Sequence, residues 1–209
     1  DFKTYPSDIK KDLSVLKKIK GIDFIFIPKF RDIYDAKKKS EIKIDIKDKI
    51  LCAKYRIGHF EGVLDVMDRL TGLIKPKKIF MGKKDFQQLF LVKNFIEQKY
   101  KTKVIGCKTI RNKNKLALSS RNYLLNKDDL KIAGNISKKF FLIKKKIKDH
   151  KNIRKFLLET KKIMQKEFKI KIEYLELRNE KNLILSKNFK GSKLFVSYYL
   201  KDIRLIDNF

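Results

Sequence analysis

Apolar residues recur along this chain with two spacings, one typical of helices and one typical of strands. From residue 63 to 74 they fall three or four positions apart after Gly62, which predicts an amphipathic helix that ends near Pro76. A strand is predicted at 79–81, followed by a helix over 85–98 and a second strand at 103–106. Helices and strands in this alternation indicate βαβ units on a parallel sheet.

The beginning of the chain predicts three further elements. Ser7 is a candidate N-cap for a helix with one apolar face, and Gly21 is its stop signal. Residues 22–27 form a nearly continuous apolar run ended by a proline, a pattern typical of a strand buried on both faces. Residues 42–46 alternate strictly between isoleucine and a charged residue, which predicts a half-exposed strand or hairpin arm.

The character of the chain changes after residue 108. Two lysine-rich helices and then three strands are predicted, over residues 127–148, 151–168, 172–177, 194–199 and 203–206. Helices followed by neighbouring strands indicate a small α+β domain. We therefore expect an α/β fold with one domain over 1–108 and a second over 109–209.

Charge is the largest departure in composition, with 54 lysines and arginines against 24 acidic residues and a net charge of +30. A basic chain favours nucleic acid, because contacts to phosphates release counterions. Lysine far outnumbers arginine, however, and it is spread over every segment. Bidentate recognition of bases and phosphates favours arginine. We expect no specific nucleic-acid partner, and a basic nucleic-acid-binding module remains an alternative.

Composition also bears on the kind of chain and its location. The 43% of hydrophobic residues is typical of a globular protein. Its apolar runs fall short of the ~20 residues that cross a bilayer, so no membrane partner is expected and the cytoplasm is the default location. The chain begins at Asp1 without a methionine, so we expect further sequence upstream. Cys52 and Cys107 have neither a CxxC nor a zinc spacing, and both are interpreted as buried, reduced thiols.

The first candidate for chemistry is Gly82-Lys83-Lys84-Asp85, between a predicted strand and a predicted helix. Ligands in open α/β sheets bind at the carboxyl ends of strands, and the free N–H groups of a helix N-terminus suit phosphate. Lys84 could supply a mobile cation for a polyphosphate. In the alternative interpretation, Asp85 simply caps the helix and Gln88 completes a capping box.

Two further segments carry candidate polar groups. Ser119-Ser120-Arg121-Asn122 combines compact hydroxyl donors with a planar guanidinium that fits phosphate oxygens. The same residues also form ordinary turns and helix starts. His59 could act as an acid, a base or a ligand, but the only other histidine is distant in the sequence. A packed histidine at a helix start is the favoured interpretation.

The order of these motifs adds information that each lacks separately. Four motifs follow one another, namely His59-Phe60-Glu61-Gly62-Val63, Gly82 to Gln88, Leu116 to Asn122, and Arg204-Leu205-Ile206-Asp207-Asn208. In this order they resemble the pantothenate synthetase (pantoate–β-alanine ligase) family over essentially the whole chain. The resemblance implies a Rossmann-like nucleotidyltransferase domain, here without its first strands, a small C-terminal domain that closes over ATP, and a homodimer.

The resemblance also implies a reaction. Pantoate and β-alanine are condensed through a pantoyl adenylate, with ATP as a substrate and Mg²⁺ as its metal, and the products are pantothenate (a coenzyme A precursor), AMP and pyrophosphate. The implied catalytic residues, which hold the triphosphate, are Lys84, Ser119, Ser120 and Arg121. The rest of the implied ATP site is Gly82, Lys83, Asp85, Ile110 and Leu118, and the implied pantoate site is Gln88, Val63, Val66 and Met67. No metal ligands are assigned.

The chain departs from the family pattern in several places. The family's His-x-Gly-His nucleotide signature and its first pantoate-binding glutamine do not occur in the 209 residues. The family usually has glutamate at Lys83, glycine at Lys115 and arginine at Ser7. We therefore expect the full-length protein to be the ligase and residues 1–209 alone to have negligible activity. A related enzyme for another carboxylic acid and a non-catalytic remnant of the ligase are the remaining alternatives.

Overall fold

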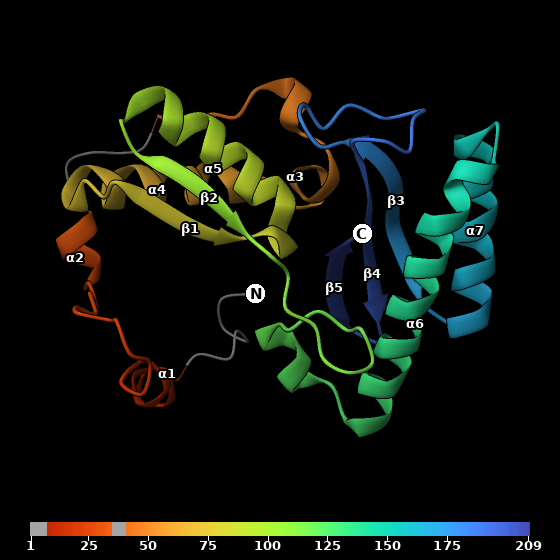
Figure 1. The fold of residues 1–209 in the computed structure, drawn as a ribbon, viewed down its shortest axis with the longest axis horizontal. Helices are drawn as coiled ribbons and strands as arrows, with labels where there is room; N and C mark the ends of the chain where they lie inside the picture. The colour runs from red at the N-terminus through yellow and green to blue at the C-terminus, as the bar shows by residue number, and fades with distance from the viewer. Residues whose placement is uncertain (1–7, 35–40) are drawn as a thin grey trace. The chain divides into compact units, whose positions relative to one another are not determined.

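A computed structural model describes residues 8–34 and 41–209. The chain divides into two compact units, Asp1–Glu41 and Ile42–Phe209 (Figure 1). Within the described ranges, no helix combines the length and the apolar character needed to cross a membrane.

The first unit contains two short helices, α1 (Ile9–Leu16) and α2 (Phe30–Ile33). Asp8 is the N-cap of α1, and its Oδ1 accepts a hydrogen bond from the backbone N–H of Lys11 at 3.0 Å. The predicted cap, Ser7, lies outside the described residues. The helix was correctly expected, although it ends well before Gly21.

The strand predicted at residues 22–27 is wrong, because these residues have no regular secondary structure. Their side chains are exposed, with 94% of the surface of Phe24 accessible. A strand needs a neighbouring strand to pair its backbone N–H and C=O groups. The paired strands in the described part of the chain all lie after residue 77, and the apolar run pairs with none of them.

The second unit begins with a loop where residues 42–46 were predicted to be a strand. A 3₁₀ helix, η2, occupies Ile46–Asp48 instead. Ile44 is buried, whereas Ile46 is 87% exposed. The side-chain nitrogen of Gln87 donates to the carbonyls of Asp48 and Ile50, at 3.1 and 2.8 Å. These bonds hold the chain that follows the loop, and residues 42–46 have no neighbouring strand among the described residues.

The first half of this unit is a βαβ unit with additional helices, as predicted. Its elements are α3 (Leu51–Tyr55), α4 (His59–Ile74), β1 (Lys78–Gly82), η3 (Lys83–Asp85), α5 (Phe86–Lys99) and β2 (Lys103–Cys107). The strands β1 and β2 are parallel, with Ile79 opposite Val104. Helix α4 begins at His59, earlier than the apolar pattern indicated, because Gly58 adopts a left-handed conformation with φ of 75° and starts the helix there.

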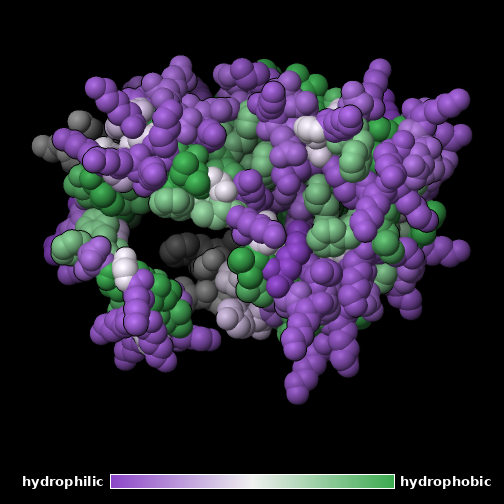
Figure 2. All heavy atoms as spheres, in the orientation of Figure 1, coloured by the Kyte–Doolittle hydropathy of each residue, from purple (hydrophilic) through white to green (hydrophobic). Residues whose placement is uncertain are grey.

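The second half is the predicted α+β arrangement. Its elements are η4 (Ser120–Leu124), α6 (Lys127–Lys146), η5 (Ile147–Asp149), α7 (Ile153–Phe168), β3 (Lys171–Asn179), β4 (Ser192–Leu200) and β5 (Ile203–Asn208). The three strands form an antiparallel sheet in the order β3-β4-β5. Hydrophilic side chains cover much of the visible surface over α6 and α7 (Figure 2), as their many lysines require.

Both faces of the antiparallel sheet are buried, and this joins the two halves of the unit. Leu194, Val196 and Tyr198 on β4 face the core formed with α6 and α7. Phe195 on β4 and Tyr174 on β3 belong to a second core, built mainly by α3, α4, α5 and β2. Successive residues of a strand point to opposite faces, so β4 contributes to both cores. The sheet therefore positions the end of β5 against the βαβ half.

Candidate functional site

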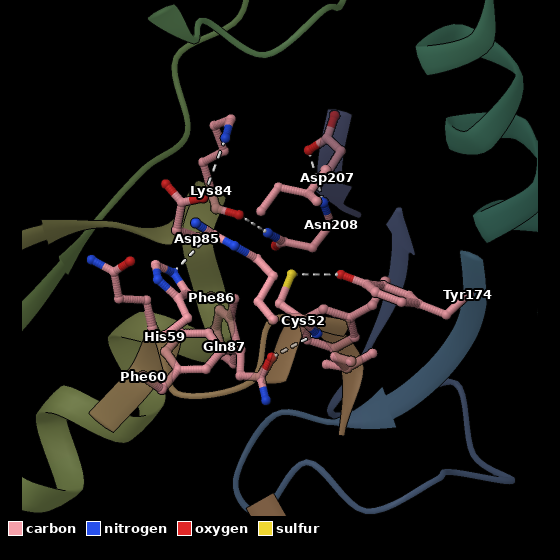
Figure 3. Close-up of a pocket in the computed structure, with 15 residues that line it drawn as sticks. Cys52, His59, Phe60, Lys84, Asp85, Phe86, Gln87, Tyr174, Asp207 and Asn208 are labelled. Atoms are coloured by element: carbon pink, nitrogen blue, oxygen red, sulfur yellow. Dashed lines mark hydrogen bonds and ion pairs between the residues drawn. The ribbon is translucent and has the colours of Figure 1, made fainter. Parts of the chain in front are cut away.

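A cleft opens where β1 ends and α5 begins, at the position where the sequence predicted a ligand site. It encloses about 430 Å³ of unfilled space, including its open mouth. Its walls come from α3, α4, η3, α5 and the antiparallel sheet (Figure 3). The polar residues along it are Cys52, Arg56, His59, Lys84, Asp85, Gln87, Gln88, Tyr174, Asp207 and Asn208.

Lys84, Asp85 and Gln88, three of the predicted site residues, line this cleft together. The Nζ of Lys84 lies 3.3 Å from Oδ1 of Asp85, and 49% of the Asp85 side-chain surface is exposed against 18% for Lys84. Asp85 stands at the N-cap position of α5, but within the described structure its carboxylate makes no capping hydrogen bond. The capping-box interpretation is therefore wrong, and the carboxylate and the ammonium are both available at the cleft.

Gln87, beside the predicted Gln88, has a structural role that the sequence did not reveal. It is buried, and its Oε1 accepts a hydrogen bond from the backbone N–H of Cys52 at 3.0 Å. With its two donor bonds to the preceding loop, it ties the start of α3 to α5. The two neighbouring glutamines therefore have different roles. The amide of Gln87 fixes the wall of the cleft, and Gln88 lines the cleft.

Arg56 and His59 form a hydrogen-bonded pair on the opposite wall. The Nη1 of Arg56 lies 2.7 Å from Nε2 of His59. Burial lowers the pKa of His59 to about 4, and the positive charges of Arg56, Arg121 and Arg204 contribute in the same direction. The sequence favoured a histidine that is merely packed at a helix start. It does start α4, but it is only half-buried and it borders the cleft.

The predicted triphosphate segment approaches the cleft from the second half of the unit. Ser119 caps η4, and its Oγ accepts from the backbone N–H of Arg121 at 3.3 Å. The Nη1 of Arg121 donates to the carbonyl of Arg204 on β5 at 2.9 Å. Ser119, Ser120 and Arg121 do not belong to the wall of the described cleft. The charge of Arg121 nevertheless acts on His59 and Arg56, so its guanidinium lies near the cleft.

The other predicted residues occupy different positions around these groups. Leu118 is exposed, and its N–H donates to the carbonyl of Ile110, also exposed, at 2.9 Å. Gly82 lies opposite Cys107 at the end of the parallel pair. The side chain of Lys83 crosses over Gly106 of β2, where an added Cβ would lie 3.0 Å from Lys83 Cε.

The predicted pantoate wall lies on helix α4. Val63 and Met67 pack against the hydrophobic core, and Val66 is half-buried. All three lie outside the wall of the described cleft, whereas Gln88 is part of it.

A buried ionic network that the sequence did not reveal supports the base of the cleft. Glu173 Oε2 accepts from Nη2 and Nε of Arg204, at 2.7 and 2.9 Å, and from Ser197 Oγ at 2.8 Å. Burial favours the neutral acid, but the bonds from Arg204 and Ser197 outweigh it and the pKa of Glu173 is lowered. The Sγ of Cys52 lies 3.1 Å from Oη of Tyr174, and both residues line the cleft.

The two thiols differ from the sequence interpretation in one respect. Cys52 is buried as expected, whereas Cys107 is exposed. Cys107 ends β2 on the side of the parallel pair that also carries the exposed Phe80 and Ile105. Neither cysteine belongs to a metal site, since no cluster of three or more His, Cys, Asp or Glu side chains occurs among the described residues.

Comparisons with known proteins identify the family. A family model described as pantoate-beta-alanine ligase matches residues 1–209. The chain is 35% identical over 215 residues to a pantothenate synthetase of Clostridium botulinum (strain Langeland), covering 100% of this chain and 75% of that protein. It is also 32% identical over 218 residues to a pantothenate synthetase of Sulfurihydrogenibium sp..

Two solved structures are also similar. A pantothenate synthetase from Thermus thermophilus superposes with a TM-score of 0.90 at 25% identity, over 100% of this chain and 76% of that one. A pantoate-beta-alanine ligase from Francisella tularensis, complexed with beta-gamma ATP and beta-alanine, has a TM-score of 0.79 at 30% identity, over 100% of this chain and 72% of that one.

Proposed function

We propose, because this chain belongs to the pantoate-beta-alanine ligase family, that it takes part in the ATP-dependent ligation of pantoate to β-alanine. One observation carries the assignment of the site. Lys84, Asp85 and Gln88 meet in a single cleft at the carboxyl end of β1, and Arg121 approaches the same cleft through β5. A cation, a carboxylate and an amide in this place suit a nucleotide and a small hydroxy acid.

The reaction has two displacements. A carboxylate oxygen of pantoate attacks the α-phosphorus of ATP, and the bond from that phosphorus to the oxygen bridging to the β-phosphorus breaks, releasing pyrophosphate. The amine of β-alanine then attacks the acyl carbon of the adenylate, loses a proton as the C–N bond forms, and expels AMP. Charge gathers on phosphate oxygens in the first step, so fixed cations and donors supply most of the stabilisation.

The chain's own residues divide these tasks. Lys84 and Arg121 supply positive charge to the triphosphate, and Ser119 and Ser120 supply hydroxyl donors. The remaining nucleotide contacts come from Gly82, Lys83, Asp85, Ile110 and Leu118. Gln88 donates a hydrogen bond to pantoate. The dimethyl group of pantoate lies against Val63, Val66 and Met67 once the cleft has closed around the substrate.

Mg²⁺ fits this arrangement as an ion carried by ATP. Magnesium in nucleotide sites is commonly bound by one or two carboxylates together with substrate phosphates. Asp85 provides a half-exposed carboxylate whose contact with Lys84 is long, at 3.3 Å, whereas Asp207 is held by Arg111 in two contacts at 2.6 and 2.8 Å. Asp85 would therefore hold the ion with the phosphates, and the ion would neutralise charge on the departing pyrophosphate.

We further propose a cytoplasmic homodimer in which residues 1–108 belong to the nucleotide- and pantoate-binding domain and residues 109–209 to a lid over ATP. The boundary falls in the loop between β2 and η4, where the parallel pair ends. Closure of the lid would exclude water from the adenylate, which hydrolysis would otherwise destroy.

Substituting Lys84 tests the site. Lys84→Met should lower ATP–pyrophosphate exchange with pantoate in the full-length protein by about 100-fold, because a fixed cation is lost from the transition state. Lys93→Met, on the exposed side of α5, is the matched control and should leave the rate within about twofold. Equal rates for the two variants would refute the proposed role of Lys84. The activity of residues 1–209 alone is a separate question. Measuring AMP release from the full-length protein and from residues 1–209 answers it, and negligible turnover is expected of residues 1–209.

A further inference from the structure

Strand β5 ends in an arrangement that holds the turn carrying Lys84. The Nδ2 of Asn208 donates to two successive carbonyls, those of Lys83 at 2.9 Å and Lys84 at 2.8 Å. An amide nitrogen has two hydrogens, so both are used and each carbonyl receives one. Asn208 is 5% exposed, and water therefore does not compete effectively for these bonds. Two carbonyls directed at one nitrogen restrict the backbone from which the Lys84 side chain extends.

Asn208 is itself held from the opposite side. Its backbone N–H donates to Oδ1 of Asp207 at 2.8 Å, and its carbonyl accepts from Nη2 of Arg111 at 3.1 Å. Asp207 and Arg111 form a two-pronged ion pair at 2.6 and 2.8 Å, the strongest geometry available to these groups. The guanidinium also lies 4.9 and 5.0 Å from the ring centroids of Phe141 and Phe209, contacts that favour one orientation.

The same arginine reaches the loop that leads to the predicted triphosphate segment. The Nη1 of Arg111 donates to the carbonyl of Lys115 at 3.0 Å. A continuous series of hydrogen bonds therefore connects Lys115 in that loop, through Arg111, Asp207 and Asn208, to the backbone of Lys84. We call Arg111, Asp207 and Asn208 the C-terminal clamp. It joins two segments that lie far apart in the sequence and come from opposite halves of the unit.

We propose that the C-terminal clamp is a positioning device that sets where Lys84 stands relative to the Leu118–Arg121 segment, so that both reach one polyphosphate. Asn208 borders the cleft, but both of its amide hydrogens are taken by the carbonyls of Lys83 and Lys84, and in this scheme it acts through Lys84. Misplacing a reactive group by about 1 Å can cost about 100-fold in rate, so a clamp of this kind has a large effect without contacting ATP. The inference rests on the proposed role of Lys84.

A double-mutant cycle on ATP binding tests the inference, with isothermal titration calorimetry of the full-length protein and ATP as the probe. Asn208→Ala should weaken ATP binding by about tenfold. Asn208→Asp, with the same shape but an acceptor facing two carbonyls, should weaken it at least as much. Asn179→Ala is the matched control, because Asn179 ends β3 and its Oδ1 accepts from the backbone N–H of Lys181 in its own turn. Thermal melting of each variant reports any general loss of stability.

The cycle is completed with Lys84→Met. If Asn208 acts through Lys84, Asn208→Ala should have less than about a twofold further effect once Lys84 has been replaced, since the two losses are not independent. Equal effects of Asn208→Ala in both backgrounds would overturn the clamp and leave the site intact. An unchanged affinity in Lys84→Met, or a wild-type chain that does not bind ATP, would instead overturn the proposed site, and the clamp with it. Should Asn208→Ala fail to fold, Arg111→Lys tests the same path, because it keeps the charge but loses the two-pronged contact.

Discussion

Arg56 donates a hydrogen bond from Nη1 to Nε2 of His59 across 2.7 Å. Arginine carries no acceptor, so Nε2 must be the acceptor and must lack a proton. A neutral ring with a bare Nε2 carries its proton on Nδ1. The pair therefore selects one tautomer of His59 beside the cleft, and burial, followed by the positive charge of Arg56, lowers the pKa of the ring.

The protonation of His59 gives the first prediction. Its ring should titrate near pH 4, as read from its imidazole resonances by NMR, instead of near 6.5. Between these values the unfolded chain binds the proton and the folded chain does not, so acidification through this window should lower the free energy of unfolding. Replacing His59 by glutamine should reduce that slope. A midpoint near 6.5 would contradict the burial and the charges assigned to it.

Lys115 occupies a backbone conformation that suits glycine. Its φ is 72°, in the left-handed region that costs a residue with a side chain about 1 kcal/mol. Lys115→Gly should therefore raise the free energy of unfolding by roughly 0.5 kcal/mol, after the greater flexibility of the unfolded chain is included. Lys113→Gly, two positions earlier, should lower it. Urea denaturation of both variants measures their free energies of unfolding. A lower value for Lys115→Gly than for Lys113→Gly would exclude strain at Lys115.

Gly134 permits a close approach of α6 to the loop before Ser119. A Cβ at this position would lie 2.4 Å from Cγ of Asn114 and 2.9 Å from its Cβ. Asn114 also accepts from the backbone of Leu116 at 3.3 Å, so the loop must move. Gly134→Ala should cost about 2 kcal/mol of stability. Gly62→Ala in α4, where an added Cβ meets nothing within 4 Å, should instead be neutral or stabilising by up to about 1 kcal/mol.

The pair formed by Glu173 and Arg204 is nearly dry, with 8% and 11% of their side chains exposed. Glu173→Gln should destabilise the fold by about 3 kcal/mol, because it leaves a buried guanidinium without its counter-charge. The pKa of Glu173 is lowered on folding, so its contribution is present above the unfolded pKa and is lost as pH falls through the folded one. Glu159→Gln, on the exposed side of α7, is the control for chemical denaturation. Equal denaturation midpoints for Glu173→Gln and Glu159→Gln would contradict a stabilising role of the ion pair.

Local patterns predicted most of the regular structure. The helix over 63–74 and the strands at 79–81 and 103–106 have strong periodicity and short connections, and they form as expected. The runs at 22–27 and 42–46 have patterns just as clear but no strand beside them among the described residues. A strand depends on a partner that is distant in sequence, and its own residues do not reveal whether the partner is present.

The candidate site likewise has residues that the sequence predicted and supporting residues that it did not. The motif that carries Lys84 was visible because its residues are contiguous and lie between a strand and a helix. The supports were not visible, since Asn208 contacts Lys84, and Arg111 contacts Asp207, across long stretches of intervening sequence. Composition gives no signal for such bonds, and only the packing of β5 against both halves creates them.

The unequal accessibility of the two sulfur atoms offers a practical route to the nucleotide site. Cys107 is exposed and lies opposite Gly82, whereas Cys52 is enclosed. Within residues 1–209, a maleimide dye added to the native protein would therefore attach at Cys107, next to the turn that carries Lys84. Its emission would then register the arrival of ATP in real time, in the natural sequence.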